Sequence, residues 1–181
     1  MRIVIASDIH GRVTPARKLS ELISSYSPDR VLLLGDYLYG GPNAISAPDY
    51  DPYQVARILN KHARRIIGIR GDCDCRADQK ALLFPIGEEC RVLEIDGYRV
   101  DMIHGDLLTG DILTVERGDI LLFGHTHVPV LKKEDGVVYF NPGSVSLPKN
   151  GFPTSFALFE RGKIEIKRLD DKATFLELDL L

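Results

Sequence analysis

The chain has 181 residues, 44% of them hydrophobic and 27% charged, and this length predicts a single domain over residues 1–181 with a sizeable core. Its formal net charge of −3 argues against bulk attraction to duplex nucleic acid or to an anionic membrane, and no apolar run approaches the roughly eighteen residues of a membrane span. The N-terminus lacks a signal-peptide pattern and the three cysteines form no disulfide framework, so we expect a cytoplasmic protein.

The first predicted element is a strand at Ile3–Ala6, because four consecutive apolar residues, mostly β-branched, suit a strand buried on both faces. This strand leads into Asp8 and His10, and Gly11 then allows the chain to turn away from the sheet. Open α/β sheets bind their ligands at the carboxyl ends of the strands. The Asp-x-His pair is therefore a candidate for binding one metal ion.

A helix and a second buried strand follow this pair. Thr14 and Pro15 predict the N-cap and the first residue of a helix that continues with apolar residues at helical spacing to Tyr26. The second strand, at 30–34, leads into Asp36. An acidic residue thus again follows a buried strand.

The long segment from Tyr37 to Tyr50 predicts either a functional loop or a solvated excursion. Its tyrosines Tyr37, Tyr39 and Tyr50 can either stack on a base or an aryl group of a substrate or simply pack against the protein. A helix beginning at Asp51-Pro52 and a third strand at 65–69 come next, and this strand leads into Asp72. The alternation of strands and helices predicts right-handed crossovers and a parallel sheet.

The second half predicts a helix at 77–83 and then mainly hairpins. Turn signals occur at Asp96-Gly97, Asp135-Gly136 and Arg161-Gly162. The predicted strands are 92–95, 98–103, 120–123, 137–140, 155–159, 164–169 and, as an edge strand, 174–180. The fold class is therefore α/β, with two mixed β-sheets packed as a sandwich and flanked by helices.

Four of the five histidines and three aspartates lie at predicted strand ends, whereas His62 is expected to be a helix-flank residue without chemistry. Unpaired imidazoles and carboxylates gathered at one sheet edge are costly without cations between them. The candidate metal ligands are Asp8, His10, Asp36, Asp72, His104, His125 and His127. Seven nitrogen and oxygen ligands suit two divalent transition-metal ions, for which we expect Mn, with Zn, Fe, Ni or Co as alternatives. Two such ions, about 3.5–4 Å apart, can hold a bridging hydroxide for in-line attack at phosphorus.

These strand-end motifs resemble the signature of the calcineurin-like metallophosphoesterases, and especially of their small bacterial and archaeal YfcE-type phosphodiesterases. The matching segments are Asp8-x-His10, Gly35-Asp36, Gly71-Asp72-Cys73-Asp74, His104-Gly105 and Gly124-His125-Thr126-His127, with Gly40–Asn43 and Asn141–Ser146 as further matches. The resemblance implies the αββα fold of that superfamily and hydrolysis of small phosphodiesters with good leaving groups.

The resemblance also implies a division of the ligands between two metals. One metal would be held by Asp8, His10, Asp36 and His127, and the other by Asp36 as a bridge, Asp72, His104 and His125. Asp36, Cys73 and His104 are the residues expected to take part in catalysis. Whether the Asn141–Ser146 turn has a direct role or only joins two strands is open.

Three positions depart from the pattern of the superfamily. Asp72 stands where Asn is usual, Cys73 stands where larger relatives carry a histidine acid, and Asp106 stands where a second histidine is common.

Two other functions compete with the small phosphodiesterase. A non-catalytic scaffold of the same fold, which binds protein partners, has no need of seven intact ligand positions. A nuclease is disfavoured by the small size, the negative charge and the lack of a basic stripe with interleaved aromatics. We expect no membrane partner, and self-association into a homo-oligomer is left open.

Overall fold

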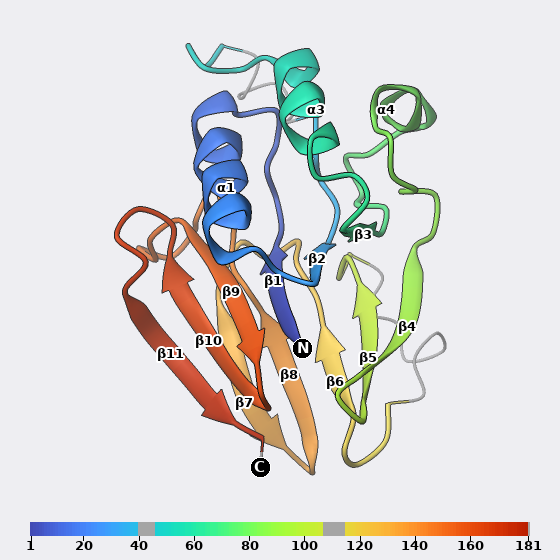
Figure 1. The fold of residues 1–181 in the computed structure, drawn as a ribbon, viewed down its shortest axis with the longest axis vertical. Coiled ribbons are helices and arrows are strands. Elements are labelled where there is room, and N and C mark those ends of the chain that lie inside the picture. The colour runs from blue at the N-terminus through green and yellow to red at the C-terminus, as the bar shows by residue number, and fades with distance from the viewer. Residues whose placement is uncertain (40–45, 107–114, 181) are drawn as a thin grey trace.

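The strands of the first half and the C-terminal strands form one mixed sheet (Figure 1). The computed structural model describes residues 1–39, 46–106 and 115–180. The strands of this first sheet are β1 (Arg2–Ala6), β2 (Arg30–Leu33), β3 (Ile66–Gly68), β9 (Ser155–Glu160), β10 (Lys163–Arg168) and β11 (Thr174–Asp179). They lie in the order β11-β10-β9-β1-β2-β3, with β1, β2 and β3 parallel and β9 antiparallel to β1.

A second mixed sheet packs against the first. Its strands are β4 (Cys90–Ile95), β5 (Tyr98–Ile103), β6 (Ile120–Leu122), β7 (Val130–Glu134) and β8 (Val137–Asn141). They lie in the order β4-β5-β6-β8-β7, and β5, β6 and β8 are parallel. The predicted α/β fold with two mixed sheets is thus confirmed. The strand β7 was missed, because Val-Leu-Lys-Lys-Glu does not alternate apolar and polar residues.

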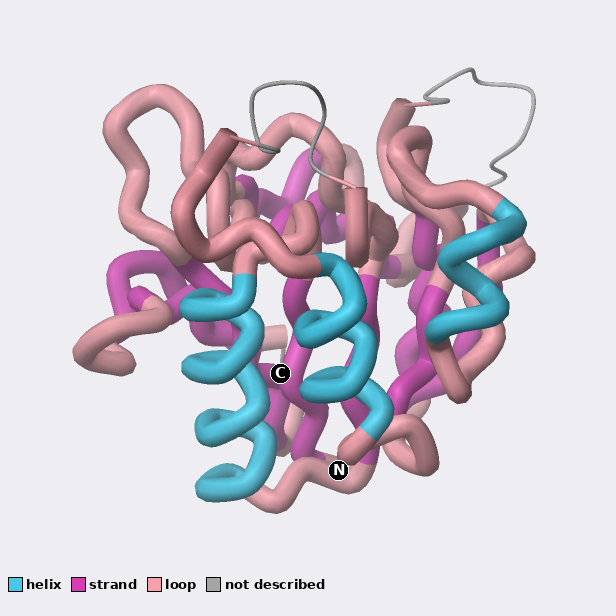
Figure 2. The backbone as a smooth tube through the Cα atoms, turned by 90° about the horizontal axis from the view of Figure 1, so that it is seen from above, coloured by secondary structure: helices cyan, strands magenta, loops and turns pink. Residues whose placement is uncertain are grey.

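The described helices are α1 (Val13–Tyr26), α3 (Pro52–Asn60) and α4 (Arg76–Ala81). Figures 1 and 2 show them on one side of the strands. None of the helices in the described part of the chain is long and apolar enough to cross a membrane. No helix of the described residues lies on the outer face of the second sheet. The described helices therefore pack on the first sheet.

The predicted start of the first helix is wrong by two residues. The helix α1 begins at Val13 with Arg12 as its N-cap, and so Thr14 and Pro15 lie inside its first turn. The backbone amide of Val13 donates to the carbonyl of Asp49 at 2.9 Å, which gives an otherwise unpaired helix-end amide a partner from the following loop. The start of α3 is as predicted, with Asp51 as N-cap accepting from the amide of Gln54 at 2.9 Å.

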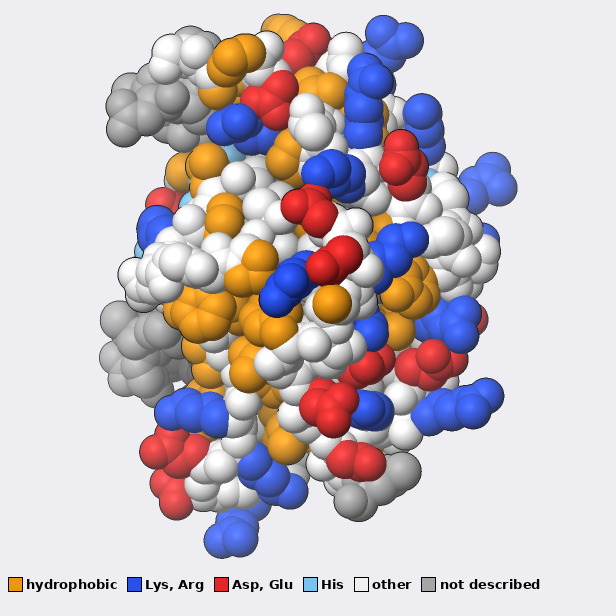
Figure 3. Space-filling model, turned by 90° about the vertical axis from the view of Figure 1, so that its left-hand side faces the viewer, with side chains coloured by type: hydrophobic (Ala, Val, Ile, Leu, Met, Phe, Trp, Pro, Cys, Tyr) orange, Lys and Arg blue, Asp and Glu red, His pale blue; other side chains and the backbone are white. Residues whose placement is uncertain are grey.

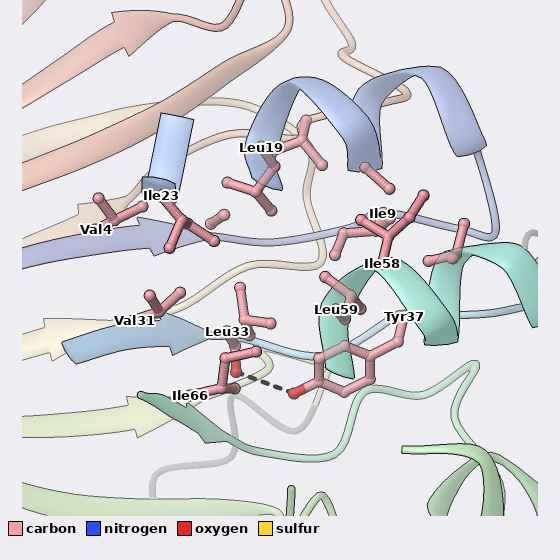
Figure 4. Packing of buried hydrophobic residues seen from close by; sticks show 14 of the residues in the cluster. Val4, Ile9, Leu19, Ile23, Val31, Leu33, Tyr37, Ile58, Leu59 and Ile66 are labelled. Atoms are coloured by element: carbon pink, nitrogen blue, oxygen red, sulfur yellow. Dashed lines mark hydrogen bonds between the residues drawn. The ribbon is translucent and has the colours of Figure 1, made fainter. Parts of the chain in front are cut away.

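The side chains of β1 and β2 alternate between two hydrophobic clusters. Val4 and Leu33 belong to the cluster under α1 and α3, whereas Ile5 and Leu32 belong to the cluster between the two sheets. Figure 4 shows the first cluster, in which side chains from both strands meet those of both helices. Burial on both faces explains the continuous apolar runs that predict these strands.

The three predicted hairpin turns are confirmed, and each begins with a non-glycine residue at positive φ followed by a glycine. The C-terminal strand β11 is an edge strand, also as predicted. Its exposed Glu177 pairs with Lys163 of β10 at 2.9 Å, and charges of both signs are interspersed over this side of the molecule (Figure 3). Charged side chains on an edge strand discourage pairing with a further strand.

Candidate metal centre

The carboxyl ends of the parallel strands in both sheets meet at one end of the molecule (Figure 1). All seven predicted ligands lie there, and they form two groups in which one ligand atom per residue lies within 4.8 Å of the others. The first group is Asp8, His10, Asp36 and His127, and the second is Asp72, His104 and His125. Each group therefore draws on both sheets, with β1, β2 or β3 on one side and β5 or β6 on the other.

Five of these residues have backbone conformations in the left-handed region. Their φ angles lie between 51° and 62°, at Asp8, His10, Asp36, His125 and His127. Such conformations cost non-glycine residues of order 1–3 kcal/mol each and cluster at functional sites. Here they turn the side chains from successive strand ends toward one region, which a regular strand would not do.

Two histidines of the first group have their tautomers set by backbone carbonyls. Nδ1 of His10 lies 2.9 Å from the carbonyl oxygen of Tyr39, and Nδ1 of His127 lies 2.6 Å from that of Leu147. Only a protonated Nδ1 can donate there, which leaves the lone pair of each neutral ring on Nε2. The two Nε2 atoms face each other at 3.1 Å. A cation close to both would relieve the repulsion between these lone pairs.

Asp8 provides a direct test of whether a cation fits. Its side chain is fully buried, and neither carboxylate oxygen has a hydrogen-bond partner in the described part of the chain. Nε2 of His127 lies 3.3 Å from its Oδ1. A buried, unpaired carboxylate is costly. The donor set of Asp8 and its neighbours therefore fits a divalent cation.

Asp36 lies between the two groups. Its Oδ2 is 3.5 Å from Nε2 of His10 in the first group and 3.5 Å from Nε2 of His104 in the second. Its Oδ1 accepts a hydrogen bond from the amide of Cys73 at 3.0 Å. Burial opposes ionisation, but the hydrogen bond and charge of His104 outweigh it and lower the pKa of Asp36.

The second group is more open to solvent. Oδ1 of Asp72 lies 2.8 Å from Nε2 of His104 and 3.1 Å from Nδ1 of His125, and the side chains of Asp72 and His125 are 42% and 40% exposed. Burial opposes ionisation of Asp72, but its hydrogen bonds with His125 and His104 lower its pKa. For His104 burial disfavours the charged ring, yet the hydrogen bond and charge of Asp36 raise its pKa to about 10. This open side suits the approach of a substrate.

Cys73 is half-buried beside Asp36 and Asp72. Burial first, and then the charges of these two carboxylates, raise the pKa of its thiol to about 12. A thiol with such a pKa stays protonated near neutral pH and is a weak hydrogen-bond donor. Cys73 thus lies at the centre, as predicted, but its chemistry is that of a neutral group.

Asp74 and the Asn141–Ser146 turn act on the backbone around the ligands. The buried carboxylate of Asp74 accepts from the amides of Asp36 and Gly71 at 2.8 Å and from that of Tyr37 at 2.9 Å. The hydroxyls of Ser144 and Ser146 both donate to the carbonyl of Asp8 at 2.8 Å. The two serine contacts give the Asn141–Ser146 turn an indirect role, because they position the backbone of Asp8. The sequence does not predict this role of Asp74, because its hydrogen-bond partners are backbone amides, which the pattern of side chains does not reveal.

Two glycines allow close contacts at the centre. A Cβ atom on Gly71 would lie 2.1 Å from Oδ1 of Asp36, and one on Gly124 would lie 2.1 Å from the hydroxyl of Ser7. No side chain larger than hydrogen fits at either position without moving its neighbours. The glycines in the predicted motifs thus allow the strand ends to approach one another.

The tyrosines of the 37–50 segment have different surroundings. Tyr37 is fully buried, and its hydroxyl contacts the carbonyl oxygens of Leu33 (Figure 4) and Ile69, so of the two alternatives it packs in the core and does not stack on a substrate. Tyr50 is partly buried, and its ring lies against Gly11. Tyr39 is 41% exposed and its carbonyl contacts His10, so it can contact a substrate. The predicted match at Gly40–Asn43 lies outside the described residues.

His62, the fifth histidine, belongs to neither group of ligands in the described part of the chain. Its Nε2 lies 2.7 Å from the hydroxyl of Ser20 on α1. Burial, and then the charges of Arg65 and Lys61, lower its pKa. This agrees with the expectation of a helix-flank residue.

The chain is similar to phosphoesterases over most of its length. The model of the calcineurin-like phosphoesterase superfamily domain matches residues 1–163. Phosphodiesterase YfcE of Escherichia coli strain K12 is 34% identical over 179 residues, covering 98% of this chain and 97% of the relative.

The fold is also found in solved structures. The structure of YfcE, described as a phosphoesterase from E. coli, matches with a TM-score of 0.94 and 32% identity, covering 100% of both chains. Vps29 of Entamoeba histolytica, solved in complex with zinc, matches with a TM-score of 0.65 and 22% identity, again over 100% of both chains. At this lower identity the likeness concerns the fold alone.

Proposed function

This chain belongs to the calcineurin-like phosphoesterase superfamily and is a metal-dependent phosphoesterase, and we propose that it hydrolyses small phosphodiesters using two divalent metal ions. The observation that carries the two-metal proposal is the position of Asp36, whose Oδ2 is 3.5 Å from a histidine nitrogen of each ligand group. A carboxylate that lies between two ligand groups can bind an ion of each group and so bridge a pair of ions. In two-metal sites the bound ions activate water as a nucleophile and stabilise the charge that develops on the phosphate.

The protein residues hold the centre ready for this chemistry. Asp8, His10, Asp36 and His127 would hold the first ion, and Asp36, Asp72, His104 and His125 the second. The carbonyls that accept from Nδ1 of His10, His104 and His127 keep Nε2 free as the ligand atom. Such outer contacts orient ligand side chains and raise their basicity.

The substrates we propose are phosphodiesters with good leaving groups. The relative from E. coli is named a phosphodiesterase. Cys73 stands where a general acid would help the leaving oxygen, and a neutral thiol is a weak hydrogen-bond donor and so a poor general acid. An aryl leaving group needs little protonation, and the exposed ring of Tyr39 is available to contact it.

The proposed cofactor is a pair of Mn²⁺ ions, with Zn, Fe, Ni or Co as alternatives, since the mixed nitrogen and oxygen donors suit all of them. We further propose that the protein works in the cytoplasm without a membrane or duplex nucleic acid as partner. Against the alternative of a non-catalytic scaffold stands the complete set of seven ligand residues. A scaffold would gain nothing from five of them in strained conformations.

The test combines metal analysis with activity. Protein saturated with Mn²⁺ should contain two ions per chain by elemental analysis and should hydrolyse a chromogenic aryl phosphodiester, and chelation should abolish this activity. Asp36→Asn should be the most damaging single change, because it weakens a ligand of both ions. Asp49→Asn is the matched control, since that carboxylate pairs with Arg12 outside the ligand groups. At most one ion in the saturated protein would refute the two-metal proposal, and two ions without turnover across diesters and monoesters would favour the scaffold.

A further inference from the structure

The segment after β8 brings a lysine to the edge of the metal centre. The amide of Lys149 donates to the carbonyl of His127 at 3.2 Å, and the carbonyl of Leu147, two residues earlier, accepts from Nδ1 of the same histidine at 2.6 Å. The amide of Leu147 in turn donates to the hydroxyl of Ser144 at 2.9 Å, and that hydroxyl donates to the carbonyl of Asp8. The segment is thus attached to two ligand residues of the first group.

The backbone beyond Lys149 turns back at once, which holds this residue at the tip of the segment. Asn150 and Gly151 both have positive φ, at 55° and 76°, and the amide of Phe152 donates to the carbonyl of Lys149 at 3.1 Å. Lys149 is therefore held through its amide and its carbonyl, and its side chain is exposed. No hydrogen bond or ion pair of its ammonium group is found in the described part of the chain.

The backbone contact with His127 places Lys149 beside the first ligand group. A lysine side chain is long and flexible, so its ammonium group can reach an anion bound at this group. Arg12, which follows the Gly11 turn after β1, makes a useful contrast, because Asp49 already neutralises its guanidinium. Among the described residues no such counter-charge pairs with the ammonium group of Lys149, so this group is available to bind an anion at the centre.

The negative charge of the carboxylates at the centre weakens its attraction for a phosphate, which a nearby ammonium group can offset. Asp8, Asp36 and Asp72 carry three negative charges, one more than the usual Asn at the third motif would allow. Each carboxylate ligand reduces the attraction of two divalent ions for an incoming phosphate. An additional positive charge beside the first group would restore part of this attraction.

We propose that Lys149 is a substrate-binding residue, whose ammonium group contacts a non-bridging phosphate oxygen of the substrate on the side of His10 and His127. This inference rests on the proposed phosphodiesterase function and adds a residue to it. The contact is made by a flexible side chain at an exposed position, so its effect is smaller than that of a metal ligand.

The experiment compares Lys149→Ala and Lys149→Arg with the wild type, and uses Lys133→Ala as the matched control. Lys133 is also exposed, but it lies near the Asp135-Gly136 turn at the opposite end of β7 from the centre. We expect Lys149→Ala to raise KM for an aryl phosphodiester about threefold to tenfold with little change in kcat. The Mn²⁺ content should not change, Lys149→Arg should restore KM, and Lys133→Ala should have no effect.

A binding measurement separates this inference from the proposed function. The dissociation constant of inorganic phosphate for the Mn²⁺-loaded protein should rise by a similar factor in Lys149→Ala, and its dependence on ionic strength should become weaker. If phosphate binds the wild type and Lys149→Ala equally well, the inference is wrong even if the protein is a phosphodiesterase. If phosphate binding weakens as expected but no diester is hydrolysed, the proposed function fails and the anion site stands.

Discussion

At the scale of single residues, the centre depends on backbone carbonyls that orient three of its histidines. His10, His104 and His127 each direct Nδ1 at a carbonyl oxygen, at 2.9, 2.6 and 2.6 Å. His125 differs, because its Nδ1 faces Asp72 and its side chain is more exposed. The first group is thus held more rigidly than the second. Changes at the second group should therefore alter metal affinity and substrate preference before they alter folding.

For Cys73 we expect a minor catalytic role. General acid catalysis is typically worth about 10²–10⁴-fold, and it matters most for basic leaving groups. A neutral thiol is a weak hydrogen-bond donor and provides little of it. Cys73→Ala should therefore change kcat on an aryl phosphodiester by less than about threefold, and the protein should prefer aryl over alkyl esters. A loss of 10²-fold or more on the aryl substrate, with both metals still bound, would mean that Cys73 acts in catalysis.

The charge of Asp72 leads to a second prediction at this scale. Asp72→Asn removes one negative charge from the second group, which should weaken the binding of the second metal and strengthen inhibition by inorganic phosphate. The activity profile should also shift to lower pH, because water at a more positive centre is more acidic. Metal titration, phosphate inhibition and a pH–rate profile on the two proteins test this. Unchanged phosphate affinity with both metals present would count against Asp72 as a ligand.

The raised pKa of His104 predicts how the stability of the metal-free protein depends on pH. A histidine whose folded pKa of about 10 exceeds the usual 6.5 stabilises the folded state in its charged form. This stabilisation is fully present below about pH 6.5 and is lost as the pH rises toward 10. In chelator, the free energy of unfolding should fall over this range in the wild type and fall less in His104→Gln. His62→Gln serves as control, and equal slopes in all three proteins would contradict the assignment.

At the scale of elements, the loops after β2 and β3 are joined by one buried carboxylate. Asp74 accepts hydrogen bonds from amides in both loops, at Asp36 and Tyr37 after β2 and at Gly71 after β3. Burial outweighs these bonds and raises the pKa of Asp74 to about 7. Asp36 and Asp72, the candidate ligands in these two loops, are thereby held in a fixed arrangement.

Removal of this carboxylate should destabilise the protein. Asp74→Ala leaves three buried amides without their acceptor, and each unsatisfied group costs about 1–3 kcal/mol, of which water can recover a part. We expect a loss of roughly 2–4 kcal/mol in urea unfolding at pH 8 in the presence of chelator. Asp78→Ala is the control, because its carboxylate accepts one exposed amide at the start of α4 and should cost only about 1 kcal/mol. Equal losses in the two variants would show that the three amides find other partners.

The elements of the fold could be predicted where burial leaves a clear pattern. Strands buried on both faces give continuous apolar runs, and the candidate ligands can be recognised because each follows such a run. β7 is half exposed and rich in lysine, and so its pattern is hidden. The start of α1 depends on a contact with Asp49, far along the chain, which a local pattern does not contain. Asp74 and Lys149 were missed for the same reason, because their roles depend on what lies near them in space.

At the scale of the whole molecule, the candidate centre joins the two sheets at one end. Asp8, His10, Asp36 and Asp72 follow strands of the first sheet, whereas His104, His125 and His127 follow strands of the second. The two sheets also meet through the hydrophobic cluster between them. Bound metal ions would therefore act as a link between the sheets as well as a part of the reaction.

This link predicts that metal binding stabilises the whole fold. A ligand at 100 times its dissociation constant stabilises the folded state by about 2.7 kcal/mol, which for a chain of this size raises Tm by roughly 5–10 °C. Wild-type protein in Mn²⁺ should therefore unfold at least about 5 °C above the same protein in chelator, whereas Asp36→Asn should show little difference between the two conditions. Hydrogen exchange should show which part of the protein the metal stabilises. The amides of Ile9 and His10, which donate to the carbonyl of Asp36 at 2.9 Å, lie at the metal centre between the two sheets. Their protection should rise with metal more than that of amides near the Asp135-Gly136 turn. If Tm and exchange are the same with and without metal, the ions do not join the sheets.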